Sequence, residues 1–431
     1  MTTRKLTMLG ALAALSALVA ACGSTTTSSS KGPLVVGGVI AITGTSSFEG
    51  SNQSEGLLPA IYEINHNGGV MGHQLAYKGV DTRGDPADAL PAVQQMLATT
   101  SNLVAVAGPG TASAPTIVPV LNSAHIPMMA VAGESAYNRS PYSYFWRLFP
   151  PDSANGTAMA LWAKQKGYTR VAAVFGSDAG SQGDLPGVLA SLQALHVNVV
   201  ANISLTPDQS SYQSSVNQLI AAHPDVIMTE SDAGTAGTFF GELKSLGGLV
   251  PIIGTEATYT TPWLTAVQGA LGGSDFHNYF SAMIAAPSKV TAAVTAWNNA
   301  VKDDHAQLPV SVQSAQNNPF AVTYYDGMIA TALAMVAAKS TNPVDFNSYI
   351  AKVCNPGSGK TVVYTFAQGV KALNAGKQIQ YFGATGLINF DKYHNSYGNQ
   401  EAVTSSASGN TISLGQITVA AIQAVVVKGV A

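Results

Sequence analysis

The residues whose side chains could do chemistry do not combine into a complete catalytic motif. Residues 179–183 carry Ala179 where the turn that presents a nucleophilic serine needs its first glycine. Residues 357–361 read GSGKT, like the end of a phosphate-binding loop, but Cys354 occupies the place of that loop's first glycine. No two of the eight histidines have the spacing of a helical metal site. The motifs therefore do not indicate an enzyme, and we expect no metal and no cofactor.

One partial motif leaves a different function open. Residues 108–110 read GPG between an apolar run and a helical pattern, and Glu134 lies near the end of the next apolar run. This order matches part of a dinucleotide-binding fingerprint, with Ser113 in place of its third glycine, so a secreted NAD-type dehydrogenase is an alternative. Backbone N–H groups at a helix start, with the hydroxyls of Thr111 and Ser113, also suit a carboxylate or another anion.

The composition narrows the class of protein further. Only 10% of the 431 residues are charged, 46% are hydrophobic and the net charge is −3. Without an excess of basic residues there is no field to neutralise phosphates, so nucleic-acid binding is not expected. The high hydrophobic content likewise argues against disorder and in favour of a sizeable core.

The N-terminus resembles an export signal and not part of the fold. Arg4 and Lys5 precede an apolar run over residues 6–21, which is short for a membrane span and ends in VAAC at residues 19–22. This pattern predicts a bacterial lipoprotein signal peptide over residues 1–21, a lipid on Cys22 and a flexible tether over residues 22–33. An ordinary secretory peptide with an incidental cysteine is the alternative.

The protein is therefore expected to be anchored to a membrane without spanning it. Residues 417–427 are the nearest approach to a second membrane span, but Gln423 interrupts them and their composition indicates strand. Cys354, the other cysteine, is expected to be a buried free thiol.

The rest of the chain alternates short apolar runs with helical patterns. The expected strands are residues 34–40, 75–80, 103–107, 127–131, 170–175, 198–204, 225–228 and 250–253. Helical spacing of apolar residues lies between them, for example after an N-cap at Asp85 with Pro86 at the first helical position. The alternation predicts an α/β protein with two doubly wound, Rossmann-like lobes built on parallel sheets. A ligand of such sheets binds beyond the carboxyl ends of the strands.

Several short motifs also occur in a characteristic order between residues 34 and 430. Residues 64–72 read INHNGGVMG, residues 81–88 DTRGDPAD, residues 144–147 YFWR, residues 324–326 YYD and residues 383–391 GATGLINFD, and a GP…IP segment spans residues 108–127. Their order resembles the type I periplasmic binding proteins, specifically the branched-chain amino-acid receptor family of ABC importers.

The resemblance implies a ligand site shared by two lobes. The loop that holds an α-carboxylate in that family falls on Thr111 or Ala112, with Ser113 beside it, and the acid that holds an ammonium group falls on Glu256. Further ligand contacts are implied at Glu134, which stands where the family has threonine, at Gln182 or Ser181, at Asp232, and at Phe48 or Glu49. A helix-capping role is the alternative for Glu256, Thr111 and Ser113, and Glu134 could instead be a solvated loop acid or pair across the hinge.

The resemblance also implies an architecture and a function. Lobe 1 would contain residues 34–145 and 278–385, and lobe 2 residues 146–277 and 386–431, joined by a hinge of three crossings. Closure of the lobes would capture a small molecule, such as an amino acid or a related amine or amide, for the permease of an ABC transporter. We expect an extracytoplasmic, lipid-anchored monomer, with a signalling receptor that does not transport as the alternative.

Overall fold

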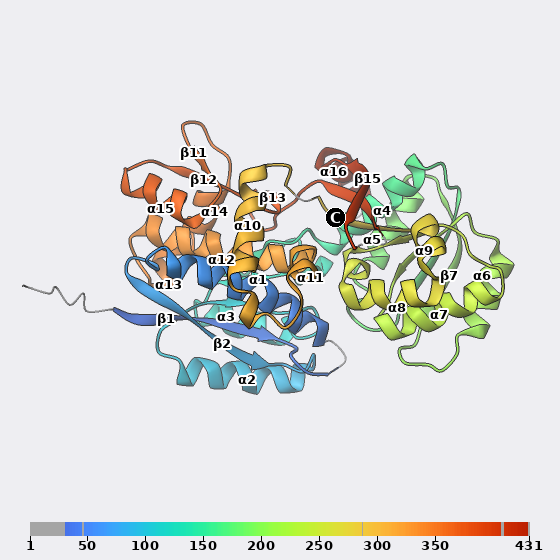
Figure 1. The fold of residues 1–431 in the computed structure, drawn as a ribbon, viewed down its shortest axis with the longest axis horizontal. Helices are drawn as coiled ribbons and strands as arrows, with labels where there is room; N and C mark the ends of the chain where they lie inside the picture. Colours follow the sequence, from blue (N-terminus) through green and yellow to red (C-terminus); the bar gives the residue numbers. More distant parts are fainter. Residues whose placement is uncertain (1–30, 45–46, 287, 407–408, 430–431) are drawn as a thin grey trace, which may run out of the picture.

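The computed structural model describes residues 31–44, 47–286, 288–406 and 409–429. The predicted signal peptide, Cys22 and most of the tether lie outside these residues. The chain forms two lobes side by side, with the blue and orange elements in one and the green and yellow elements in the other (Figure 1). Each lobe contains a central sheet covered by helices on both faces, so the predicted α/β fold with two doubly wound lobes is confirmed.

Lobe 1 begins with a five-stranded parallel sheet of order β2-β1-β3-β4-β5. The strands are β1 (Lys31–Ile40), β2 (His73–Asp81), β3 (Leu103–Ala107), β4 (Met128–Ala130) and β5 (Phe145–Arg147). The connecting helices are α1 (Ser47–His66), α2 (Pro86–Thr99) and α3 (Ala114–Ser123). The predicted N-cap of α2 is confirmed, because the Asp85 carboxylate accepts a 2.8 Å hydrogen bond from the backbone N–H of Ala87.

Lobe 2 is built on a seven-stranded sheet of order β15-β14-β10-β9-β8-β6-β7. The strands are β6 (Arg170–Gly176), β7 (Asn198–Leu205), β8 (Val226–Glu230), β9 (Ile252–Gly254), β10 (Phe280–Ala285), β14 (Gln400–Ser405) and β15 (Thr411–Ile417). The helices are α4 (Asp152–Gln165), α5 (Leu185–Ala194), α6 (Gln213–Ala222), α7 (Ala233–Ser245), α8 (Thr261–Leu271), α9 (Gly273–Tyr279) and α16 (Val419–Gly429). Strands β6 to β10 run parallel, and β14 and β15 are antiparallel to their neighbours.

A late segment returns the chain to lobe 1. It contains α10 (Thr291–Asp303), α11 (Val312–Gln316), α12 (Pro319–Ala338), α13 (Pro343–Phe346), α14 (Tyr349–Cys354), α15 (Phe366–Asn374) and a small sheet of β11 (Thr361–Val363), β12 (Ile379–Gly383) and β13 (Gly386–Leu387). Helix α12 packs along α1 and supplies much of the core on that face of the first sheet. The predicted burial of the Cys354 thiol is confirmed, since this residue belongs to the same core.

Helix α12 alone, among the described residues, is long and apolar enough to cross a membrane, and 78% of it is buried within the lobe. Its length and composition therefore reflect a core helix, which the sequence patterns did not reveal. The expectation of strand over residues 417–427 is wrong, because β15 ends at Ile417 and α16 follows it. The patterns failed there because a short, wholly apolar run has no period that separates strand from helix.

The lobe limits differ from the predicted ones by a few residues at each crossing. Strand β5 pairs with β4, so the first crossing follows Arg147. Strand β10 pairs with β9 and β14 in lobe 2, so residues 280–285 do not belong to lobe 1. Strand β13 pairs with β12 in lobe 1, so the third crossing lies between Leu387 and Gln400. Strand pairing, which links residues distant in sequence, decides these limits, whereas the motifs mark only the neighbourhood of each crossing.

Buried contacts between two crossings hold the hinge. The backbone N–H of Arg147 donates to the carbonyl of His394 at 3.0 Å, and Ser396 donates to the Arg147 carbonyl at 2.9 Å. The rings of Trp146 and His394 stack with centroids 3.7 Å apart. The first and third crossings therefore form one short, parallel connection beneath the cleft.

Candidate ligand-binding site

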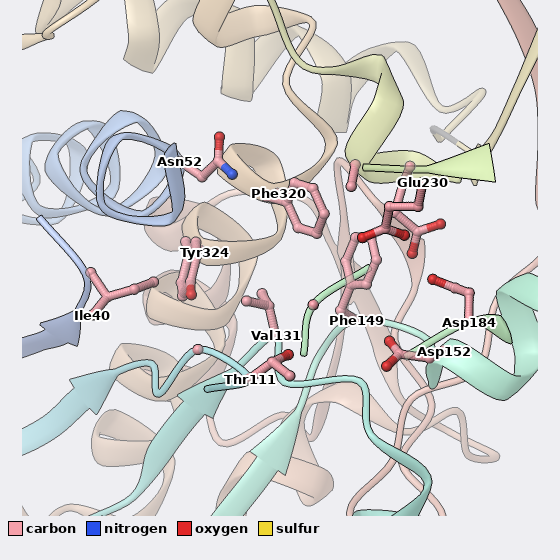
Figure 2. A pocket seen from close by; sticks show the side chains of 14 residues that line it. Ile40, Asn52, Thr111, Val131, Phe149, Asp152, Asp184, Glu230, Phe320 and Tyr324 are labelled. Atoms are coloured by element: carbon pink, nitrogen blue, oxygen red, sulfur yellow. The ribbon is translucent and has the colours of Figure 1, made fainter. Parts of the chain in front are cut away.

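A cavity of about 70 Å³ lies between the lobes, at the carboxyl ends of their parallel strands. Both lobes line it. Figure 2 shows carboxylates on one side, two phenylalanines in the middle, and aliphatic and tyrosine side chains on the other side. The lining residues are Ile40, Asn52, Gly110, Thr111, Val131, Phe149, Asp152, Gly180, Asp184, Glu230, Glu256, Ala257, Phe320 and Tyr324.

The wall formed by lobe 1 and the first crossing is mostly apolar. Phe149 follows β5 and stacks on Phe320, near the start of α12, with ring centroids 4.8 Å apart. Tyr324 lies one turn further along α12, and Ile40 ends β1. These rings offer a surface for hydrocarbon or, through their negative faces, for an organic cation.

The wall formed by lobe 2 is acidic. Asp152 is the first residue of α4, Asp184 immediately precedes α5, and Glu230 is the last residue of β8. Glu256 follows β9 at the start of a 3₁₀ turn, Glu256–Tyr259. Because the carboxyl ends of parallel strands and the amino ends of the following helices meet at one sheet edge, these four side chains gather around one cavity.

Two of these carboxylates are buried without a complete set of partners. Asp184 is 6% exposed, Glu256 is 5% exposed and Glu230 is 9% exposed. One oxygen of Asp184 (Oδ1) and one of Glu256 (Oε2) accept no hydrogen bond in the described part of the chain. Buried polar atoms are nearly always paired in native structures, so these two oxygens mark a place where a partner binds.

The acids also raise one another's pKa. Burial, opposed in part by Arg147, raises the pKa of Asp152 to about 6. Burial, together with the charge of Asp152, raises the pKa of Glu230 to about 8. Burial and the neighbouring carboxylates place the pKa of Asp184 and of Glu256 well above the ordinary range. Removing water and adding like charges both disfavour ionisation, so this cluster holds protons until a cation compensates it.

Arg147 is the nearest cation, yet its hydrogen bonds go to other groups. Its guanidinium donates to the carbonyls of Gly133 and Glu134, at 2.7 and 3.1 Å, and to the side-chain oxygens of Asn138 and Asn395, at 2.9 and 2.8 Å. Within the described ranges the ion pairs are Arg83–Asp88 and Lys244–Asp275, both outside the cleft. Arg147 therefore fixes the hinge and leaves the four carboxylates without a direct cationic partner.

Two of the predicted ligand residues line the cavity. Thr111 lies in the turn after β3 and before α3, and Glu256 lies on the opposite wall. Ser113 is the N-cap position of α3 but does not line the cavity, and its hydroxyl donates to the carbonyl of Gly110 at 3.4 Å. Of the two residues predicted to contact the ligand near the start of α3, Thr111 lines the cavity and Ser113 does not.

The other predicted ligand residues lie beside this cavity or beyond it. Glu134 occupies the N-cap position of a 3₁₀ turn, Ser135–Tyr137, without a side-chain capping bond, and does not line the cavity. The Gln182 amide donates to the carbonyl of Gly176, and Asp232 caps α7 by accepting from the Thr235 N–H at 2.9 Å. Asp232 lines a second cavity, of about 360 Å³, which shares Gly180, Glu230 and Ala257 with the first. The side chain of Phe48 is outside the described part of the chain.

Five residues that dominate the site were not predicted from the sequence: Asp152, Asp184, Glu230, Phe149 and Phe320. Asp152 and Asp184 stand at helix starts, where an acid is common for capping reasons alone. Glu230 is the last residue of β8, whereas the strand predicted from the sequence ends at residue 228. A rule that every acid beyond a parallel strand is a candidate would have found the acids, because β8 and β9 end at Glu230 and two residues before Glu256.

Comparison with known proteins shows the family of the chain. A family profile described as "Periplasmic binding protein" matches residues 33–353. The Leu/Ile/Val-binding protein BraC3 of Rhizobium johnstonii is 22% identical over 269 residues, which cover 62% of this chain and 73% of BraC3. The chemotactic substrate-binding protein BasB of Halobacterium salinarum is 22% identical over 375 residues, which cover 83% of each chain.

Solved structures share the fold at lower sequence identity. The branched-chain amino acid transporter substrate-binding protein LivJ of Streptococcus pneumoniae, in complex with isoleucine, has a TM-score of 0.70 and 18% identity, covering 90% of this chain and 99% of LivJ. A solute-binding protein of an R. palustris ABC transporter, in complex with benzoate, has a TM-score of 0.70 and 16% identity, covering 90% of this chain and 96% of its own.

The fold and the shared cleft define a two-lobed solute-binding protein of type I. Because the profile spans most of the sequence, the chain belongs to the periplasmic binding protein family, and the resemblance drawn from the motifs is confirmed.

Proposed function

We propose that the protein is an extracytoplasmic solute receptor that captures a small molecule between its lobes and delivers it to the permease of an ABC importer. The observation that carries this proposal is the cavity lined by both lobes at the carboxyl ends of their strands. A ligand that contacts both walls stabilises the closed state, and the shift is set by its preference for that state. No bond is made or broken in this cycle, so the protein is not an enzyme.

The ligand is an amino acid or a related amine. A nitrogen cation would fit between Glu256 and its neighbouring acids, and the remainder would lie against Phe149 and Phe320. The names of BraC3 and LivJ refer to leucine, isoleucine or valine, and the R. palustris protein holds benzoate. The family thus accommodates ligands of different charge, and the acidic wall favours the nitrogen-containing class.

The first experiment tests capture and closure together. A thermal-shift screen of amino acids, amides, polyamines and small carboxylic acids would identify a stabilising compound, since a ligand that binds only the native state raises the melting temperature. Small-angle scattering with that compound should show a smaller radius of gyration. An unchanged scattering profile at saturating ligand would exclude hinge closure.

The second experiment tests the membrane anchor. We propose that the lipid on Cys22 holds the receptor at the outer face of the cell membrane, on the tether of residues 22–33. Cys22→Ser should abolish labelling by a palmitate analogue and release the protein into the soluble fraction, with Cys354→Ser as a matched control that stays membrane-bound. A Cys22→Ser variant that fractionates like the wild type would contradict the anchor.

Sensing without transport is a second candidate, which the chemotactic role in the name of BasB favours. The two functions differ in their partners. Genes for a permease and an ATPase beside this one would support transport, and a histidine kinase gene would support sensing. Ligand uptake that disappears on deletion of the gene would decide for transport.

A further inference from the structure

We infer that the ligand is an organic polycation, a linear amine with at least two cationic nitrogens and no carboxylate. This inference rests on the proposed function and narrows its ligand class. The cleft has acids distributed over two adjoining cavities on one side and aromatic rings on the other. This geometry points to a polycationic ligand.

The acids line more of the cleft than a single ammonium group could contact. The first cavity has Asp152, Asp184, Glu230 and Glu256 in its wall. The second cavity shares Glu230 and adds three further acids, namely Asp178, Asp208 and Asp232. No lysine, arginine or histidine lines either cavity in the described part of the chain. A ligand with one positive charge would leave most of this wall uncompensated, whereas a chain of amines would compensate it over its length.

The acids are a prepared site because several of their oxygens have no partner within the protein. Asp184 Oδ1 and Glu256 Oε2 belong to side chains that are 6% and 5% exposed, they accept no hydrogen bond, and both residues line the first cavity. In the second cavity Asp232 Oδ2 is also unpartnered, although its Oδ1 caps α7. Unpartnered acceptors thus belong to residues of both cavities, which share Glu230, as separate ammonium groups of one ligand require.

The opposite wall offers an α-carboxylate some neutral donors but no cation. Recognition of a carboxylate needs donors or a cation, and the lobe 1 wall offers the Thr111 hydroxyl and nearby backbone N–H groups. Arg147, the nearest guanidinium, donates to carbonyl and amide oxygens of the hinge. A ligand carboxylate would also lie among unpaired acids and be repelled by them. The rings of Phe149 and Phe320 instead provide apolar contact for the methylene groups between two amines.

An inorganic cation is the other way to compensate acids, and the geometry disfavours it. Within the ranges that the structure describes, no three His, Cys, Asp or Glu side chains are close enough together to hold a metal ion. Divalent cations need such convergence of oxygen ligands. The acids instead line two adjoining cavities that share Glu230, as an elongated ligand requires.

Isothermal titration calorimetry on the purified protein tests the inference with five probes. They are butane-1,4-diamine, a longer linear triamine, butylamine, isoleucine and Ca²⁺. We expect at least tenfold tighter binding of the diamine or triamine than of butylamine and isoleucine, with affinity that falls as salt rises because the contacts are ionic. Tighter or equal binding of isoleucine, butylamine or Ca²⁺ would overturn the inference.

Single substitutions test which acids contact the separate ammonium groups of the ligand. Asp184→Asn should weaken diamine binding about tenfold, and Asp232→Asn should weaken triamine binding more than diamine binding. Asp275→Asn, which removes an acid paired with Lys244 at 2.9 Å outside the cleft, is the matched control and should change neither. Equal losses for all probes in Asp184→Asn would contradict separate ammonium sites.

The outcomes distinguish this inference from the proposed function. Isoleucine binding accompanied by closure in scattering would retain the solute receptor and reject the polycation. Absence of binding and closure with every amine, amino acid and acid tested would reject both.

Discussion

Asp326 in lobe 1 and the cleft acids of lobe 2 are buried in opposite ways, and the difference identifies the site. In lobe 1, Asp326 on α12 is fully buried and accepts four hydrogen bonds. The donors are the Tyr381 hydroxyl at 2.7 Å, the Ala384 N–H at 3.0 Å, and the N–H and hydroxyl of Thr385 at 2.7 and 2.6 Å. In lobe 2, the equally enclosed Asp184 and Glu256 each keep an oxygen without a donor.

Two further acids of lobe 1, Glu63 and Glu55, follow the pattern of Asp326. Glu63 accepts from the Tyr325 hydroxyl and from the Phe366 N–H, the latter at 3.1 Å. Glu55 accepts from Ser51 and from Asn318, at 2.5 and 2.8 Å. Burial alone therefore does not mark a functional acid. A carboxylate whose acceptors are all used holds the fold, and one with vacant acceptors in a cavity is available to a ligand.

The largest expected effect is on folding, at Asp326. Asp326→Asn replaces an acceptor oxygen by an amide group that faces donors, so at least one buried N–H or hydroxyl loses its partner. Losing buried, charge-assisted hydrogen bonds costs about 3 kcal/mol or more. We expect urea unfolding to show a fall of that size in the free energy of unfolding. Asp184→Asn is the matched control, and an equal loss there would remove the distinction between the two kinds of acid.

The next effect is on binding, at Glu256. Glu256→Gln removes the charge that would neutralise a ligand nitrogen but retains the shape of the side chain. A hydrogen bond to a charged partner contributes about 1.5–3 kcal/mol, so affinity should fall by about ten- to hundredfold. Calorimetry with the compound found in the thermal-shift screen measures this change in affinity. A melting curve confirms that the variant is folded. Unchanged affinity would assign Glu256 to capping its 3₁₀ turn.

The third effect is a dependence of stability on pH. In the unfolded chain the four cleft acids titrate near pH 4, whereas in the folded protein Asp152 and Glu230 have a pKa of about 6 and about 8. Between these limits the folded state binds more protons than the unfolded state, so the stability of the ligand-free protein falls as pH rises from about 4 to 8. The nearby charges that act on the cluster are Arg147, which favours ionisation, and Asp178, which opposes it.

Glu230→Gln tests this dependence directly. The amide cannot ionise, so the variant should be more stable than the wild type by several kcal/mol at pH 8, as the raised pKa of Glu230 implies, and equal to it at pH 4. Denaturant titrations at the two pH values give the difference, and Asp275→Asn serves as the exposed control. A wild type that gains stability between pH 5 and 8 while Glu230→Gln does not would show that the acids are compensated inside the protein.

Local patterns were sufficient to predict the architecture. The N-cap at Asp85 and the alternation of runs place most of the first nine strands correctly. They could not show that residues 280–285 join the second sheet, because that depends on pairing with β14. Nor could they reveal α12, whose apolar residues surround the helix and leave no period to detect.

The site was predictable where position along the chain decides it. Thr111 and Glu256, which were predicted because each follows a strand end and falls on a family motif, line the cavity. Asp152 and Asp184 were missed because an acid at a helix start has the same sequence signature whether it caps the helix or faces a cavity. Only the folded structure shows that neither makes a side-chain cap bond to its helix.

The smallest expected effect separates the two hydroxyls at the start of α3. Thr111 lines the cavity, whereas the Ser113 hydroxyl is buried and bonds weakly, at 3.4 Å, to the carbonyl of Gly110. A neutral hydrogen bond contributes about 0.5–1.5 kcal/mol. Thr111→Ala should therefore weaken ligand binding by a few fold and leave the melting temperature nearly unchanged. Ser113→Ala should leave the affinity unchanged. One calorimetric series measures the dissociation constants of both variants. A larger loss for Ser113→Ala than for Thr111→Ala would mean that the helix start, and not the turn before it, contacts the ligand.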